Sequence, residues 1–587
     1  MGTGASGSDD ISGLTARIRR NGRSPAVLMA TFLLGTLTAA LFIPSHRTSG
    51  VNAGGGSVYG LGSTAGGASG GALGVGAAGE SGTGLGPSAT GPGPGTGAAA
   101  GGVGGSDGDA VGPGSTIGAS GGAVGPGAAG VGGGVGASGS TTATPPGGNG
   151  GATAVGVTAT SITVGILGGN SQAIGPVCPR CAGIDSATDQ ATVSGMIAAW
   201  HKEGKLPIYG RDLKPFFQSA NDLDTTGASE QEACENLETD KPFVVLTGAG
   251  TDDSWECLTQ TYHTLAVDAA GGQAAEGAAG NQPVGLYSEA PYLWELGPSM
   301  ETVLTGWASW ANQMGLLKGQ VLGLYEEDDA DDNGLQEILN ATFVAQLKKL
   351  GYQLKVDYAY SGEGESDDAV AVAKMKAAGV TVVFVSPTLT EPAGFQSQAT
   401  QVGYHPKYPV ADQGSYAFTD AEADISYNAD AENGNSGLGY RWWNWSARDP
   451  ATPADNQAAA QCVSAYEAET GTTLDVYKDD AQLRYILDEC SDLDVILAAM
   501  TDAGPHLTQT TFIQAIEKIQ DMQTPEYESV SFGPGQYFGD NVWQSESFND
   551  ARWQPSNDYW KPVGAYTPWS VWPQDQSTVA AAIQKGQ

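Results

Sequence analysis

The sequence is poor in basic residues. It contains 26 lysine and arginine residues against 64 aspartate and glutamate residues, so the formal net charge is -38 at pH 7. Proteins bind a nucleic-acid backbone by neutralising its phosphates with basic side chains, so this balance excludes nucleic acid as a partner. We interpret the acidity as a solubility feature of an exterior protein, with recruitment of cations as the alternative.

Signals for metal and nucleotide chemistry are also scarce. The five histidines are scattered along the chain, and no second C-x-x-C pair accompanies Cys178 and Cys181, which argues against zinc. No P-loop pattern occurs. We therefore expect neither a metal nor a cofactor.

Bulky side chains are rare between residues 44 and 155, where glycine, alanine and serine dominate. Such a segment cannot bury enough apolar surface to offset the entropy of ordering, so we predict a disordered linker there. Residues 156 to 587 are enough for two domains that share one function.

Before the linker, an apolar segment from Ala26 to Ile43 follows several arginines. Its length is near the minimum for a transmembrane helix and also fits a long signal-peptide core, so both interpretations stay open. The basic flank predicts that residues 1–25 are cytoplasmic and that the rest is exported. We expect the folded part to be extracellular, either anchored to the cell membrane or secreted.

All six cysteines follow the linker, as expected in a compartment that permits disulfides. Proximity along the chain favours the pairs Cys178–Cys181, Cys234–Cys257 and Cys462–Cys490. The C-x-x-C spacing of the first pair also occurs in redox motifs. A redox motif opens a helix directly after a strand, whereas this one lies among glycine and proline, which favours a structural disulfide.

Strands and helices alternate after residue 156. Apolar or alternating runs predict strands in "SITVGIL", "KPFVVL", "VLGLYEE", "LKVDYAY", "VTVVFV" and "YPVA". Helices are predicted from Leu335 to Leu350 and from about Asp367 to Ala378, the second with Val370, Ala373 and Ala377 on its apolar side. This succession predicts parallel sheets, in which ligands bind beyond the carboxyl ends of the strands.

These stretches carry a family resemblance. "GVTATSITVGILGG", "LYSEAPYLWELGPSM", "VLGLYEEDDADDNGLQEILNATFVAQLKKLG" and "DAVAVAKMKAAGVTVVFVSPT" resemble, in this order, segments of the branched-chain amino-acid type of ABC-transporter substrate-binding protein. The resemblance implies an α/β type I periplasmic binding protein fold, with two Rossmann-like lobes around a ligand cleft. It implies lobe 1 at 156–297 plus 413–530 and lobe 2 at 298–412 plus 531–575, with chain crossings near Gly297, Asp412 and Ser531.

The family binds its ligand with loops that follow the strands. The resemblance therefore implies a set of candidate ligand-binding residues: Asn170, Ser171, Thr247, Gly248, Tyr287, Ser288, Asp331, Thr388 and Gln413. Amino-acid binders carry a stacking tyrosine where this chain has Asp331, which argues against a simple leucine-like ligand. The acidic run from Glu326 to Asp332 is either a solvated loop or a site for a cationic group or metal.

The resemblance implies a non-enzymatic solute-binding protein. We expect it to capture a small polar solute, amino-acid-like, an amide or related, for an ABC importer permease or a sensor. Two alternatives remain: an exported sugar-active enzyme that uses the aromatic group Tyr440, Trp442, Trp443 and Trp445, and an envelope structural protein with a degenerate cleft.

Overall fold

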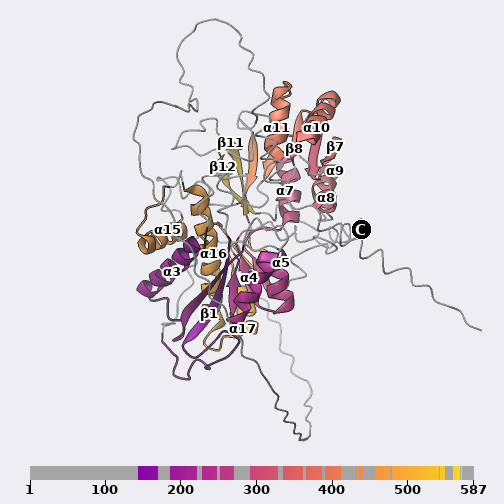
Figure 1. Cartoon of the computed structure of the whole chain (residues 1–587). Coiled ribbons are helices and arrows are strands. Elements are labelled where there is room, and N and C mark those ends of the chain that lie inside the picture. Colours follow the sequence, from indigo (N-terminus) through magenta and orange to yellow (C-terminus); the bar gives the residue numbers. More distant parts are fainter. Residues whose placement is uncertain are drawn as a thin grey trace, which may run out of the picture. The chain divides into compact units, whose positions relative to one another are not determined.

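The computed structural model of the chain (Figure 1) describes fifteen stretches of it. These are residues 143–169, 185–220, 228–247, 252–269, 291–327, 335–360, 365–385, 391–411, 431, 435–440, 456–475, 479–540, 542–548, 560–568 and 570. The segment at 26–43 and the predicted linker up to residue 142 lie outside them. Among the described residues, no helix combines the length and the apolar character that crossing a membrane requires.

The first sheet has the strand order β2-β1-β3-β4-β5, and all its neighbouring strands are parallel. Its strands are β1 (Ser161–Gly168), β2 (Asp212–Ser219), β3 (Val244–Leu246), β4 (Leu265–Asp268) and β5 (Leu293–Glu295). The intervening helices are α3 (Ser186–Glu203), α4 (Ala228–Thr239), α5 (Asp252–Trp255) and the π-helical turn η3 (Glu256–Thr261). The alternation of strand and helix after residue 156 is thereby confirmed.

Both faces of this sheet are buried. On β1, Val164 and Ile166 belong to the same core as Met196 and Trp200 of α3, whereas Leu167 packs with Leu237 of α4 and with Trp255. Alternate residues of one strand thus enter two different cores. Helices α3 and α4 occupy opposite sides of the sheet, as Figure 1 shows.

The second sheet has the order β7-β6-β8 and is also parallel. It consists of β6 (Leu322–Glu327), β7 (Leu354–Tyr360) and β8 (Val382–Val385). Around it lie α7 (Met300–Gln313), the continuous helical run α8 (Leu335–Leu339), η6 (Asn340–Val344) and α9 (Ala345–Lys349), then α10 (Glu365–Ala378) and α11 (Glu391–Gln401). Trp307 of α7 packs against Phe343 and Phe384 and so joins helix, π-turn and strand in one core.

Helix α10 forms where its sequence predicts, but the expected buried side was wrong. Val370 is 45% exposed, and Ala373 and Ala377 are exposed too. The buried residues are Val372 and Met375, together with Ala371. Alanine and valine lie all round this helix, so spacing alone does not distinguish its faces. The face with Val372 and Met375 buries more apolar area.

A third, mixed sheet has the order β12-β11-β10-β9. Its strands are β9 (Val410–Ala411), β10 (Ser436–Gly439), β11 (Val542–Phe548) and β12 (Trp560–Pro568). The family resemblance places β10 in the range of lobe 1. In the structure β10 hydrogen-bonds with β9 and β11, which both lie in the ranges of lobe 2.

Three helices complete the described part of the chain: α15 (Gln457–Thr470), α16 (Asp480–Ala503) and α17 (Gln509–Ile516). A disulfide between Cys462 and Cys490 links α15 to α16, and a second one joins Cys234 of α4 to Cys257. These are two of the pairs that chain proximity favours; Cys178 and Cys181 lie outside the described residues. Helix α15 approaches α3 at Gly195, where a Cβ would lie 2.5 Å from the Ala465 carbonyl oxygen.

At the amino end of the first sheet, a buried arginine holds the chain that leads into β1. Arg211, just before β2, is 1% exposed. Its guanidinium donates hydrogen bonds to the carbonyl oxygens of Thr158 (2.7 Å), Pro505 (2.8 Å), Gly151 (3.0 Å) and Asn149. Asn149 and Gly151 are thus part of the folded domain, although both lie within the range predicted as linker.

Candidate functional site

The carboxyl ends of the first sheet's strands form one polar edge. Strand β1 ends at Gly168, β3 is followed by Thr247, and β4 ends at Asp268. Ligands of parallel α/β sheets bind outside this edge. We therefore take it, with the helix α16 that packs against β3 and β4, as the candidate site.

Of the candidate ligand-binding residues, only Thr247 lies within the described part of the chain. Thr247 is fully buried, and its hydroxyl accepts a 3.4 Å hydrogen bond from the indole N–H of Trp255. Its backbone N–H donates to the Val267 carbonyl at 3.0 Å. These contacts tie Thr247 to α5 and β4, so the structure gives its hydroxyl a role within the fold.

The other candidates lie outside the described residues. Most of them come within a few residues of a strand end along the chain, whereas Tyr287 and Ser288 shortly precede β5. The full set is Asn170, Ser171, Gly248, Tyr287, Ser288, Asp331, Thr388 and Gln413. Their part in ligand binding stays a prediction.

Helix α16 approaches the end of β1 through a tyrosine. The backbone N–H of Gly169 donates a 2.8 Å hydrogen bond to the hydroxyl of Tyr485, 316 residues later in the chain. Gly169 directly precedes Asn170, the first candidate ligand-binding residue. Tyr485 thus fixes the point where the candidate ligand loop leaves the sheet.

Buried carboxyl groups gather at the same edge, and sequence reasoning did not single them out. Glu489 and Asp492 of α16 are 0% exposed. Glu489 interacts with Asp189 of α3, and Asp492 interacts with Asp268 at the end of β4. Burial raises the pKa of both α16 carboxyls well above the ordinary range, and the neighbouring carboxylates raise it further.

Two sequence signals could have located this cluster. The strand "LAVD" ends in an aspartate at its carboxyl end, and "ILDECSDLDVIL" places acidic residues inside an apolar helical run. Acidic side chains at positions that an amphipathic helix buries are rare and call for a partner.

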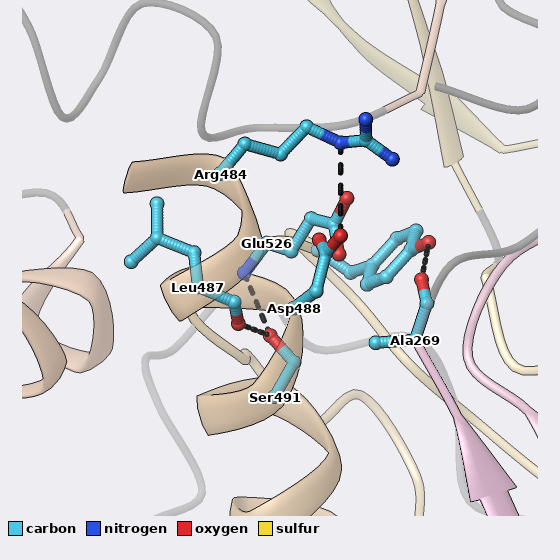
Figure 2. Close-up of polar contacts among 7 residues, drawn as sticks. Ala269, Arg484, Leu487, Asp488, Ser491 and Glu526 are labelled. Carbon is cyan, nitrogen blue, oxygen red and sulfur yellow. Dashed lines mark hydrogen bonds and ion pairs between the residues drawn. The ribbon is translucent and has the colours of Figure 1, made fainter. Parts of the chain in front are cut away.

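The segment 521–540 lies beside this edge. We call it the crossing segment because the family resemblance implies a chain crossing near Ser531. Glu295 at the end of β5 pairs in parallel with Phe538, and its N–H and carbonyl bond Tyr537 and Gly539 at 2.9 and 2.8 Å. Tyr527 donates from its hydroxyl to the Ala269 carbonyl, and the N–H of Glu526 donates to Ser491 of α16 at 3.0 Å (Figure 2). The segment 521–540 therefore bonds to β5, to the end of β4 and to α16.

The structure bears on two patterns that the sequence left open, the acidic run and the aromatic group. Glu326, first residue of the acidic run, is buried within β6 and accepts a 3.1 Å hydrogen bond from Gln336, so it is not part of a solvated loop. Tyr440 is buried and stacks on Tyr527 with parallel rings 6.3 Å apart, which is a core position and not an open sugar platform. Trp442, Trp443 and Trp445 lie outside the described residues. Among the residues that the structure describes, no group of acidic, histidine or cysteine side chains could hold a metal ion.

Comparison with known proteins defines the class. The sequence profile of a family described as "Periplasmic binding protein" matches residues 181–546, more than half of the chain. The search of curated proteins finds no match.

Solved structures similar to this chain include three solute-binding proteins. An ABC-transporter substrate-binding protein from Aeropyrum pernix superposes with a TM-score of 0.51 at 13% identity, covering 72% of this chain and 99% of its own. A leucine-, isoleucine-, valine-, threonine- and alanine-binding protein from Brucella ovis has a TM-score of 0.48 at 13% identity, with 70% and 96% covered. A solute-binding protein from R. palustris, in complex with 4-hydroxybenzoate, has a TM-score of 0.48 at 13% identity, with 70% and 97% covered.

The parallel sheets and the matched profile define a solute-binding protein of the type I periplasmic binding fold. The chain belongs to the periplasmic binding protein family. Such proteins bind solutes outside the cytoplasm for ABC transporters and are not enzymes.

Proposed function

We propose that this protein captures a small polar solute, amino-acid-like, an amide or related, between two lobes and delivers it to an ABC importer or a sensor. The observation that carries the proposal is the family match over residues 181–546, which includes strands of all three sheets. The loops that follow the strands offer hydroxyl, amide and carboxylate groups, which suit a solute with an amino or amide group.

The proposal is tested first by identifying the solute. A panel of amino acids, amides, polyamines and sugars is screened against the purified protein by isothermal titration calorimetry. The freshly purified protein is also examined by native mass spectrometry for a co-purified solute. We expect one of the first two classes to bind without being altered. Binding of sugars alone, or turnover of a bound solute, would contradict the proposal.

We expect Asp331→Asn to weaken binding of that solute by roughly tenfold or more, because a charge-assisted hydrogen bond contributes about 1.5–3 kcal/mol. Asp240→Asn is the matched control, since Asp240 is an exposed residue between α4 and β3. Equal affinity of the two variants would remove Asp331 from the site.

The segment Ala26–Ile43 is proposed to hold the protein at the membrane, or to direct its export. Its length supports either role. Mass analysis of the N-terminus of protein made by an exporting host distinguishes an intact anchor from a cleaved signal. An intact N-terminus on protein that stays in the cytoplasm would contradict both roles.

A further inference from the structure

The buried carboxyls of α16 form a cluster with acidic residues of two other elements. We define the carboxyl cluster as Asp189 of α3, Asp268 of β4 and the three α16 residues Asp488, Glu489 and Asp492, which are all at most 3% exposed. Glu489 and Asp492 are one helical turn apart, so they lie on the same side of α16. That side faces the carboxyl ends of the strands.

The Glu489 carboxyl meets Asp189 next to the end of β1. Its electrostatic neighbours there include Asp189 and Thr192, but the Thr192 hydroxyl donates to the Thr188 carbonyl at 2.9 Å. Among the described residues, neither oxygen of the Glu489 carboxyl has a hydrogen-bond partner. Asp189 also lies so close to Gly168 that a Cβ there would overlap its carboxylate. Asp189 occupies the first turn of α3, where the helix N-terminus favours a negative charge, so Glu489 is the better candidate of the two carboxyls for taking up a proton.

The Asp492 carboxyl makes the equivalent approach at β4, one turn further along α16. It lies near the Ala269 N–H and the Asp268 carboxylate, and neither of its oxygens has a hydrogen-bond partner among the described residues. Asp488 acts electrostatically on both Glu489 and Asp492 and pairs with the guanidinium of Arg484 at 3.6 Å (Figure 2). Each end of the cluster therefore places two carboxyls together away from water.

We propose that the carboxyl cluster takes up protons from solvent at Glu489 and Asp492, so that acid strengthens the packing of α16 on the ends of β1 and β4. The same packing holds Gly169 through Tyr485 and the crossing segment through Ser491. Proton uptake is thereby linked to the edge from which the candidate ligand loops start.

The direction of the effect follows from linkage. Burial, and after it the facing carboxylates, raises the pKa of Glu489 above its ordinary 4.5 and that of Asp492 above its ordinary 3.8. As pH rises past these ordinary values, the unfolded chain loses protons that the folded protein keeps. The stabilisation is fully present below about pH 4 and is lost as pH rises through the folded-state pKa values.

Other titratable groups near the cluster are few within the described residues. Helix α17 and strand β3 carry none, and α15 contributes Tyr466, which senses Glu489. The crossing segment contributes Glu526, which lies beside Asp488 in Figure 2, and α3 also contributes Asp185. Arg484 is the basic side chain that the structure pairs with the cluster.

One further α16 residue titrates separately. Part of Asp494 reaches the surface, but burial of its carboxyl raises its pKa to about 7, with Lys205 lowering and Glu203 raising it. None of the groups that shift the pKa of Asp494 belongs to the carboxyl cluster. Asp494→Asn therefore measures the share of any pH dependence that comes from this one group outside the cluster.

The test compares urea unfolding of the whole chain at several values between about pH 5 and pH 8. We expect the wild-type free energy of unfolding to fall as pH rises, and Glu489→Gln and Asp492→Asn to fall less steeply. An amide keeps the shape of a protonated carboxyl and cannot ionise, so both variants should gain stability relative to wild type at the alkaline end. Glu469→Gln, on the exposed side of α15, is the matched control and should keep the wild-type slope.

Two measurements keep the proposal falsifiable if a variant folds poorly. Calorimetric unfolding of the wild type in buffers of different ionisation enthalpy counts the protons released on unfolding, and we expect a net release near neutral pH. Hydrogen exchange of peptides covering 161–169 and 479–503, corrected for the intrinsic effect of pH, should show protection falling as pH rises. Unchanged slopes in both amide variants, or no proton release from wild type, would overturn the proposal.

Discussion

The two ends of the first sheet bury charge in opposite ways. At the amino end, one guanidinium is surrounded by backbone carbonyl oxygens of Asn149, Gly151, Thr158 and Pro505. At the carboxyl end, carboxyl groups are buried against one another, as Glu489 is against Asp189. The amino end of the sheet therefore buries a charge that has hydrogen-bond acceptors around it, whereas the carboxyl end buries groups whose charges have the same sign.

This difference separates a stabilising role from a functional one. A buried charge costs little net stability when acceptors surround it, whereas like charges in a low-dielectric interior must neutralise by taking up protons. In parallel α/β proteins the carboxyl edge is the ligand edge. The amino end of the sheet is therefore built for stability, and the carboxyl end carries an energetic cost where the candidate ligand loops begin.

The largest effect is expected from breaking the amino-end arrangement. Arg211→Met keeps the length of the side chain but leaves buried carbonyl oxygens without their donor, and each such group costs about 1–3 kcal/mol. We expect a loss of about 4–5 kcal/mol in the free energy of unfolding, measured with urea. Solute affinity of the fraction that remains folded should not change.

Lys214→Ala is the control for Arg211→Met. Lys214 lies on β2, three residues after Arg211, is exposed and contacts the Phe216 ring at 4.7 Å, so its removal should cost less than about 1 kcal/mol. A similar loss in both variants would mean that the carbonyl contacts of Arg211 add nothing specific to the stability of the amino end.

Much of the fold could be predicted from the sequence because both parallel sheets repeat a simple pattern. Short apolar runs located β1, β3, β6, β7 and β8. Strand β2 was missed, because "DLKPFFQS" contains a proline and charged residues and lies at the edge of its sheet. Strand β10 was missed because "SGLG" is too short and glycine-rich to show a period.

The site was less predictable, for a physical reason. Position after a strand end is a property of the chain and could be read along it. The meeting of Glu489 with Asp189 joins residues 300 positions apart, and only tertiary packing creates it. The family resemblance supplied loops and not the helix that packs on the strand ends, so α16 contributed no candidate residue.

The smallest expected effect sharpens the comparison most, because it uses the same substitution at both ends of the sheet. Tyr485→Phe removes the acceptor of the Gly169 N–H at the carboxyl end. Tyr209→Phe removes a hydroxyl that donates to the Thr501 carbonyl at 3.1 Å near the amino end. Each should cost about 1 kcal/mol of stability.

Only Tyr485→Phe should also weaken binding of the solute found in the screen, by several-fold in calorimetric titration. The expected reason is that the loop starting at Asn170 loses the contact that fixes its first neighbour, Gly169. If Tyr209→Phe weakens solute binding equally, the two ends of the sheet are energetically connected. The division between a stabilising end and a functional end is then wrong.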